Sequence, residues 1–176
     1  DMTDPTEVDR VVQRAQREFG GIDILSNHGG SGRGAYFAGS PLDIDDASWD
    51  RMLRQVLSSV FYATRAAGRV MAAQGRGGSI VNTSSLSSVM TPSPTSAYAT
   101  APYGVAKAGV NRYTRAAASD LAPYGIRVNA VVLGVIRNPD PAIRATRGSE
   151  AGGVRYTPPE TEEWILRETP LNRFGR

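Results

Sequence analysis

The chain has 176 residues, of which 40% are hydrophobic and 21% are charged, with one histidine and no cysteine. This composition excludes a disulfide scaffold and a cysteine-ligated zinc site, and it argues against any catalytic or metal site that needs several histidines. We therefore expect no metal. The 20 basic and 17 acidic residues give a net charge of +3, and every basic residue except Lys107 is an arginine.

The distribution of charged and apolar residues along the chain argues against nucleic-acid and membrane partners. The arginines are interleaved with acidic residues, which is typical of a solvated surface, so we expect no nucleic-acid partner. No apolar run approaches the roughly 18 residues of a membrane-spanning helix, so no membrane partner is expected either. We expect a cytoplasmic protein.

The first elements are a helix, a strand and a long loop. Asp4 as N-cap, Pro5 at the first position and Glu7 closing a capping box predict a helix over residues 5–19. Two glycines end it, and a short buried strand is predicted at residues 22–25. A Gly-rich loop follows, up to about residue 46.

The rest of the chain repeats this alternation. Apolar side chains at spacings of three and four residues predict a single long helix, and short apolar runs predict two more strands. The expected elements are a helix at residues 49–74, a strand at 79–83, a Ser/Thr/Pro-rich loop to 102, a helix at 103–121, a strand at 127–133 and a short helix near 161–167.

Strands that alternate with helices indicate an α/β fold, in which a parallel sheet is covered by helices on both faces. In such sheets the ligand site lies beyond the carboxyl ends of the strands. These ends are expected at residues 27–30, 84–88 and 134–138, and each opens into small, polar or flexible residues.

Tyr103 and Lys107 are the residues most suited to chemistry. Positions four apart share one face of a helix, so the phenol and the ammonium can reach one site. A nearby cation favours the phenolate and lowers the pKa of a tyrosine. Such a tyrosine can exchange a proton with a carbinol oxygen.

Five segments together resemble the short-chain dehydrogenase/reductase family: residues 23–30, 49–51, 77–85, 103–107 and 126–130. The resemblance covers nearly the whole chain, in order. It implies a Rossmann-like, doubly wound fold and hydride transfer between NAD or NADP and a small carbonyl or alcohol substrate. It further implies an intact protein that forms a homodimer or homotetramer.

The resemblance also implies roles for individual residues. The expected catalytic residues are Ser85, which would bind the substrate oxygen, Tyr103 as the acid/base, and Lys107, which would bind the nicotinamide ribose. The expected cofactor-binding residues, besides Tyr103 and Lys107, are Asp1, Met2, Asn27, Gly29, Gly30, Gly134 and Ile136. Simpler explanations exist: Ser85 as a turn residue, Asn27 as a sheet-end hydrogen-bonding residue, and Asp1 as the start of a helical turn.

The sequence departs from the family pattern in ways that leave alternatives open. Val56 stands where the family has an asparagine that supports its proton relay, and valine cannot make those hydrogen bonds. Tyr103 follows Ser85 by 18 positions, more than the family's usual spacing, which makes Ser88 a rival for the serine role. A noncatalytic relative, or a sugar-nucleotide epimerase or dehydratase, are the competing interpretations.

The family begins with a strand and a Gly-rich turn that hold the cofactor pyrophosphate. The glycines at residues 29–34 follow a different strand. We therefore expect residues 1–176 to be an internal part of one longer domain that lacks the Gly-rich βαβ unit and the last helix and strand.

Overall fold

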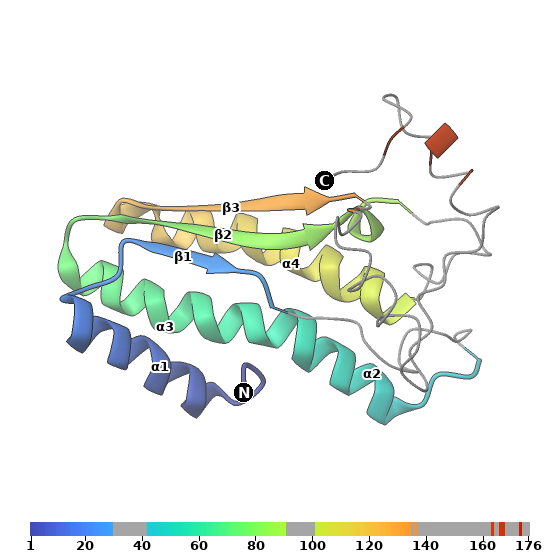
Figure 1. Ribbon diagram of the computed structural model, residues 1–176, viewed down its shortest axis with the longest axis horizontal. Coiled ribbons are helices and arrows are strands. Elements are labelled where there is room, and N and C mark those ends of the chain that lie inside the picture. Colours follow the sequence, from blue (N-terminus) through green and yellow to red (C-terminus); the bar gives the residue numbers. More distant parts are fainter. Residues whose placement is uncertain are drawn as a thin grey trace.

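The computed structural model describes residues 1–29, 42–90, 101–134, 136, 163, 166–167 and 173. Its centre is a parallel sheet of three strands in the order β1 (Ile24–Asn27), β2 (Gly78–Ser85) and β3 (Ile126–Leu133). The register aligns Asn27 with Asn82, and Ser85 with Leu133. All three strands run in the same direction, toward the right of Figure 1. The predicted α/β class and its parallel sheet are thus confirmed.

Four helices connect or precede these strands. Helix α1 (Pro5–Phe19) comes first, and β1 and β2 are joined by α2 (Asp46–Leu53), the π-helical turn η2 (Arg54–Ser58) and α3 (Ser59–Gln74). The 3-10 turn η3 (Leu86–Ser88) follows β2, and α4 (Ala101–Leu121) with the short turn η4 (Ala122–Tyr124) leads to β3.

Helices α1 to α4 all lie on one face of the sheet (Figure 1). Ala67 and Met71 of α3 and Ala117 of α4 form one buried cluster with Ile80 and Val128 of the sheet. Helix α1 is a further layer, because Val8 and Val12 pack against α3. The expectation of helices on both faces therefore holds, within the described residues, for one face only. The three strands are consecutive in the sheet, and connections that progress in one direction with the same hand place their helices on the same side.

The opposite face of the sheet carries exposed side chains. Ile24 and Val131 are exposed, whereas their sequence neighbours on the helix-covered face are more buried. This alternation follows from the period of two in a strand.

Several element boundaries differ from the sequence-based prediction. The first strand begins at Ile24 rather than at Ile22, because both backbone groups of Ile22 are bonded to the side chain of Gln74 instead of to a strand. The second strand extends through Ser84 and Ser85, which were expected in a loop. Of the expected short helix near residues 161–167, only 163 and 166–167 are described, and they are helical.

The long helix predicted at residues 49–74 is interrupted. It begins at Asp46, where the carboxylate of Asp45 accepts a hydrogen bond from Ser48 N at 2.6 Å, and it widens into the π-helical turn η2 around Val56. At the first helix, the expected capping box is not formed. Asp4 Oδ1 accepts from Thr6 N, while Asp4 N donates to Asp1 O and the Glu7 carboxylate pairs with Arg10.

Among the described helices, none combines the length and the apolar character that crossing a membrane requires.

Candidate active site

The candidate site lies at the carboxyl ends of the strands. Because the helices run antiparallel to the strands, the first turn of α4 meets the last residues of β2 at this edge (Figure 1). Tyr103 and Lys107 are supplied by α4, and Ser84 and Ser85 by β2. The fold therefore brings two of the motifs that were separate in the sequence to one edge.

Tyr103 and Lys107 lie together as the helical spacing predicts. Lys107 Nζ is 5.8 Å from the centroid of the Tyr103 ring, and it donates a hydrogen bond of 2.8 Å to Thr83 O. That carbonyl belongs to β2, so the lysine connects the helix to the end of the strand. The tyrosine ring is half-buried between α4 and the cluster formed by Met52, Val56 and Ala106.

Lys107 is a buried cation. Its residue is only 2% exposed, and this burial lowers the pKa of the ammonium from its ordinary value of 10.5 to about 8. An ammonium has three hydrogens to donate, and among the described residues Nζ donates one hydrogen bond. Within the described part of the chain, the other two hydrogens of this ammonium have no hydrogen-bond acceptor.

The two candidate serines have different surroundings. Ser85 Oγ accepts a hydrogen bond of 3.3 Å from Ser87 N, which leaves its own proton available to a ligand. Ser88 Oγ donates to Ser85 O, and it accepts from Ser84 Oγ at 3.2 Å and from Asn111 Nδ2 at 2.7 Å. The hydroxyl of Ser88 is thus used within the protein, and that of Ser85 is better suited to bind a substrate oxygen.

Asn27 has its side chain on the helix-covered face of the sheet. Its Nδ2 donates to Asn82 Oδ1 at 2.8 Å and lies 3.2 Å from Thr64 Oγ1. Asn82 Nδ2 in turn donates to Thr114 Oγ1 at 2.9 Å. Asn27 is 5% exposed, and its side chain bonds to β2 and α3 while Asn82 continues the network to α4. Contact between Asn27 and a cofactor would therefore have to use its backbone.

The other expected cofactor-binding residues are more exposed. Asp1 Oδ1 accepts from Thr3 N at 2.8 Å and from Thr3 Oγ1 at 2.9 Å, so this carboxylate starts the turn before α1, and Met2 is exposed beside it. A Cβ atom placed on Gly29 or Gly134 would meet no described atom within 4 Å, which leaves room for a ligand against the backbone.

Ile136 is 54% exposed in this region, and Gly30 lies outside the described residues.

Sequence reasoning missed three polar side chains at this edge. Thr83 Oγ1 lies 3.0 Å from His28 Nδ1, so the single histidine is held at the end of β1. Ser84 Oγ and Asn111 Nδ2 both donate hydrogen bonds to Ser88 Oγ in the turn η3. The helical spacing of Tyr103, Lys107 and Asn111, which are four residues apart, was a signal that could have indicated Asn111.

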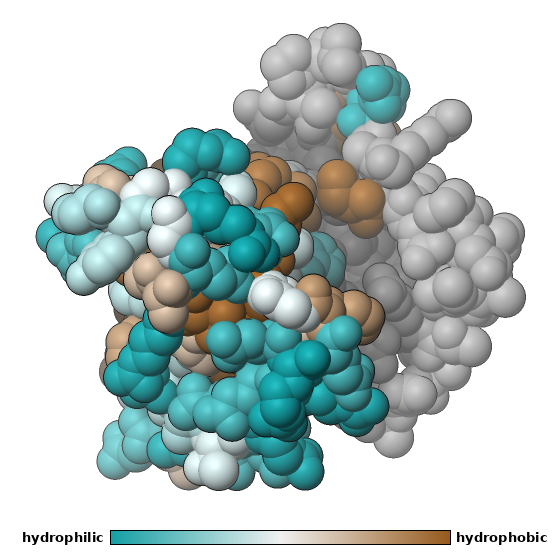
Figure 2. All heavy atoms as spheres, turned by 90° about the vertical axis from the view of Figure 1, so that its left-hand side faces the viewer, coloured by the Kyte–Doolittle hydropathy of each residue, from teal (hydrophilic) through white to brown (hydrophobic). Residues whose placement is uncertain are grey.

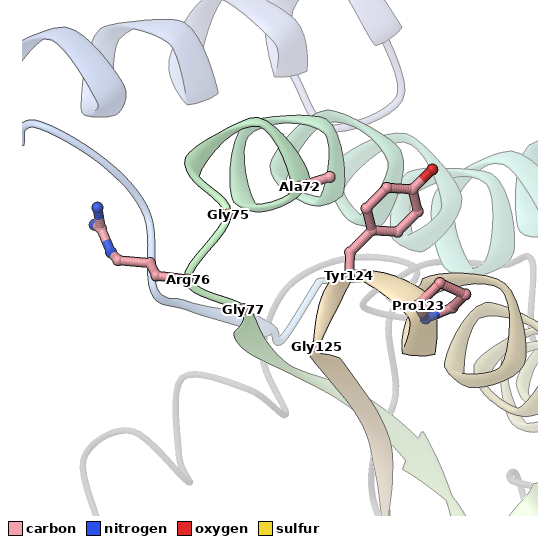
Figure 3. A pocket seen from close by; sticks show the side chains of 7 residues that line it. All are labelled: Ala72, Gly75, Arg76, Gly77, Pro123, Tyr124 and Gly125. Atoms are coloured by element: carbon pink, nitrogen blue, oxygen red, sulfur yellow. The ribbon is translucent and has the colours of Figure 1, made fainter.

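A pocket lined by described residues lies at the opposite edge of the sheet, where the strands begin (Figure 3). It is lined by Ala72, Gly75, Arg76, Gly77, Pro123, Tyr124 and Gly125. The Arg76 side chain points away from the Tyr124 ring, so no group of charged side chains converges on the pocket (Figure 3). It is not the crevice expected for a parallel sheet.

Comparison with known proteins identifies the family. The model of a family described as enoyl-(acyl carrier protein) reductase matches residues 1–175. The chain belongs to the short-chain dehydrogenase/reductase family. It is 37% identical to a galactitol 2-dehydrogenase of Rhizobium johnstonii over 99% of this chain and 61% of that protein. It is 32% identical to the 3-oxoacyl-[acyl-carrier-protein] reductase FabG of Thermotoga maritima over 99% of this chain and 62% of that protein.

Solved structures of the family have the same fold. The crystal structure of an NAD⁺-bound xylitol dehydrogenase matches 99% of this chain and 65% of that chain, with a TM-score of 0.80 and 31% identity. A short-chain type dehydrogenase/reductase from Mycobacterium marinum matches the full chain and 60% of its own, with a TM-score of 0.76 and 30% identity. The chain thus spans less than two thirds of the length of each of these four relatives.

Proposed function

We propose that the protein is an NAD(P)-dependent oxidoreductase that interconverts an alcohol and a carbonyl compound. The single observation that carries this proposal is the buried Lys107 ammonium beside the Tyr103 ring, at the carboxyl edge of a parallel sheet. The dehydrogenases and reductases among the relatives support the same reaction class.

A nicotinamide cofactor fits the donors at this edge. Lys107 Nζ retains two hydrogens that suit the hydroxyl groups of a ribose, and the open backbone at Gly29 and Gly134 allows a ligand to approach. Asp1, Met2, Asn27, Gly30 and Ile136 are proposed as further contacts, Asn27 through its backbone. When bound, the cofactor supplies or accepts the hydride at the substrate carbon. The proposed cofactor is NAD or NADP.

In the reducing direction, Tyr103 gives its phenolic proton to the substrate oxygen as the hydride reaches the carbonyl carbon, and in the oxidising direction it takes that proton back. The Lys107 ammonium, 5.8 Å from the centroid of the Tyr103 ring, places a positive charge beside the reacting groups. Ser85 donates a hydrogen bond to the oxygen on which charge develops. Burial of Lys107 makes its charge more effective, because the low local dielectric weakens screening.

Helices α3 and α4 also support a proposal of self-association. Phe61 is 38% exposed although its ring contacts Tyr62 and Tyr113 at 5.6 and 5.8 Å between centroids. Arg65 covers two of these rings, with its guanidinium carbon 5.0 Å from the centroid of Phe61. Such partly exposed aromatic surfaces are enriched in protein interfaces, which is consistent with a homodimer or homotetramer.

A noncatalytic relative is the second candidate, and Val56 is the observation that favours it. Its side chain is fully buried in η2 against Met52 and Ala106, so it offers no polar group to a proton relay. Backbone carbonyl groups could partly replace the missing polar side chain in a proton relay, since a π-helical turn displaces them from the regular helical hydrogen-bonding pattern. Of these, Gln55 O accepts from Ser59 Oγ at 2.7 Å.

The two candidates are separated by titrating the natural protein, in the length that its gene encodes, with NADH and NADPH while following nicotinamide fluorescence. A panel of alcohols and carbonyl compounds is then assayed for turnover. The proposal predicts binding of one cofactor and turnover of at least one substrate class, with weaker cofactor binding in Lys107→Arg. Binding without turnover would support the noncatalytic relative, and absence of binding would contradict both.

A further inference from the structure

We propose that Asn111 and Ser88 are positioning residues, which hold the Ser85 hydroxyl in register with Tyr103 and Lys107. This inference rests on the proposed function. We call the hydrogen-bonded group formed by Ser84, Ser88 and Asn111 the serine lock. It connects the end of β2 and the turn η3 to the same face of α4 that carries Tyr103 and Lys107.

Ser88 is the centre of the serine lock. Its Oγ donates a hydrogen bond of 2.5 Å to Ser85 O, which fixes the peptide group that follows the Ser85 side chain. It accepts from Ser84 Oγ at 3.2 Å and from Asn111 Nδ2 at 2.7 Å. One hydroxyl therefore makes three contacts that together orient the turn.

Asn111 supplies a side-chain hydrogen bond from α4 to this turn. It follows Lys107 by four residues and Tyr103 by eight, so all three lie on one face of the helix. Its Nδ2 bonds to Ser88, whereas its Oδ1 is buried and has no partner among the described residues. A buried amide oxygen without a partner costs free energy, so a purely structural role would be met better by an apolar side chain.

The helix and the turn are also in direct contact. Ser84 Oγ lies 3.4 Å from Lys107 O, and a Cβ atom on Gly104 would lie only 3.0 Å from Ser87 O. Gly104, which follows the catalytic tyrosine, thus lets η3 approach the helix closely. The serine lock therefore acts between η3 and α4, which are already in close contact.

The serine lock matters because Ser85 and Tyr103 are not close in sequence, and local chain geometry does not set their relative placement. Ser85 and Tyr103 are separated by 18 positions and lie on different elements, so their relative placement depends on contacts between β2 and α4. Non-covalent contacts across the two elements must supply it. A displacement of about 1 Å at a reacting group can cost about 100-fold in rate.

The test compares Asn111→Leu and Ser88→Ala with the unmodified protein, assaying the substrate class found in the panel. We expect kcat to fall about 10- to 100-fold while the dissociation constant of the reduced cofactor changes less than about twofold. Ser88→Thr keeps the hydroxyl and should retain most of the activity. Ser119→Ala, an exposed serine farther along α4, is the matched control.

The decisive arm is a double-mutant cycle with Ser85→Ala. If Asn111 acts by positioning Ser85, Asn111→Leu should change kcat by less than about twofold once Ser85 is an alanine. Two results would overturn the serine lock and leave the proposed function intact. One is a kcat that is unchanged in both Asn111→Leu and Ser88→Ala. The other is a loss of kcat on Asn111→Leu that is the same with Ser85 and with alanine at that position. Failure of the proposed function would instead be seen in the unmodified protein, as absence of turnover.

Discussion

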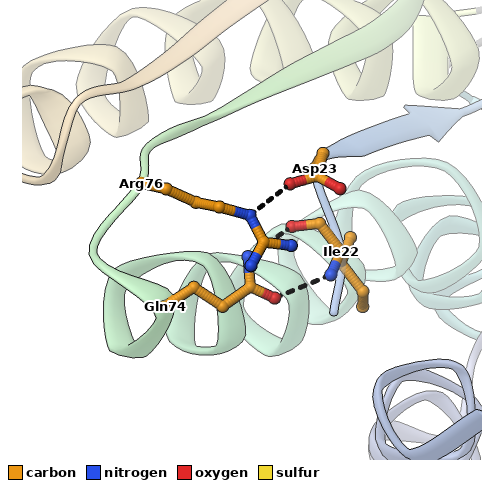
Figure 4. Close-up of polar contacts among 4 residues, drawn as sticks. All are labelled: Ile22, Asp23, Gln74 and Arg76. Carbon is orange, nitrogen blue, oxygen red and sulfur yellow. Dashed lines mark hydrogen bonds and ion pairs between the residues drawn. The ribbon is translucent and has the colours of Figure 1, made fainter. Parts of the chain in front are cut away.

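The two ends of the strands differ in their contacts: the amino edge, where the strands begin, and the carboxyl edge, where they end. At the amino edge, the backbone groups of Ile22 are both bonded to Gln74, at 2.7 and 2.9 Å, and Arg76 pairs with Asp23 at 2.8 Å (Figure 4). At the carboxyl edge, a lysine is buried at a cost to its charged form, and Asn111 Oδ1 has no partner among the described residues. The polar groups named at the amino edge are thus paired with each other, whereas the carboxyl edge, where the proposed catalytic residues lie, contains a buried cation and an amide oxygen without a partner in the described part of the chain.

The amino edge also has a close backbone contact between two glycines. Gly77, with φ +75°, lies against Gly125, and Gly78 N donates a hydrogen bond of 3.3 Å to Gly125 O. Seen from this end, the surface is largely hydrophilic, with hydrophobic atoms visible between the polar ones (Figure 2). Substitutions at this edge should alter stability without altering turnover per folded molecule, whereas substitutions at the opposite edge should alter turnover.

The largest expected effect is that of Lys107→Met. Turnover should fall about 1,000-fold or more, since both the charge beside Tyr103 and the proposed ribose contact are lost. The free energy of unfolding at pH 7 should nevertheless rise, by about 1–2 kcal/mol, because the cost of burying the ammonium exceeds the value of its single hydrogen bond to Thr83 O. Activity assays and urea denaturation measure the two effects. A less stable variant would contradict the assigned cost of burial.

The same lysine predicts a pH dependence of stability. The folded-state pKa is about 8 and the ordinary value is 10.5, so between these values the unfolded chain binds more protons than the folded one. The contribution of Lys107 to stability therefore rises as pH increases from about 8 toward 10.5. Below pH 8 both states are protonated and the full penalty is present. Comparing denaturation midpoints across this range with those of Lys107→Met isolates the contribution.

The next largest effect is expected at the amino edge, for Gly77→Ala. The new Cβ would lie 2.6 Å from Gly125 O, in a left-handed conformation, so stability should fall by about 2–4 kcal/mol. Gly75→Ala is the matched control, because Gly75 has φ +68° but open space around it, and it should cost only about 1 kcal/mol. Equal losses in the two variants would show that the contact with Gly125 is unimportant.

A smaller loss is expected for Gln74→Ala. The substitution leaves Ile22 N and Ile22 O without their side-chain partner, and it should lower the free energy of unfolding by about 1–2 kcal/mol. Turnover per folded molecule should be unchanged, since the site lies at the other edge. Gln13→Ala, an exposed position on α1, serves as the control. A change in kcat comparable to that of the serine-lock variants would argue against the separation of the two edges.

Local patterns in the sequence predicted some features of this fold correctly. The bounds of α1 followed from Asp4, Pro5 and the glycine at residue 20, which has φ 78° in the C-cap. The approach of Lys107 to Tyr103 followed from helical spacing alone. Both depend on residues within one or two turns of each other, where sequence rules are strongest.

Features that depend on distant contacts could not be predicted in this way. The start of β1 is set by Gln74, 52 residues away, and the orientation of Ser88 by Asn111, 23 residues away. In the π-helical turn, Val56 packs in a buried cluster with Ala106, which belongs to a different helix. The burial of Asn27 in a network with Asn82 and Thr64 likewise follows only from the assembled sheet and helices.

The central claim is that Tyr103 transfers the proton while the cofactor transfers the hydride, and Tyr103→Phe tests it most directly. Tyr124→Phe, which alters an exposed tyrosine in the pocket at the amino edge, is the matched control. Single-turnover rates with the preferred cofactor should fall about 100- to 10,000-fold in Tyr103→Phe while cofactor affinity is retained, and should be unchanged in Tyr124→Phe. A Tyr103→Phe protein that reacts at the rate of the unmodified protein would contradict the mechanism.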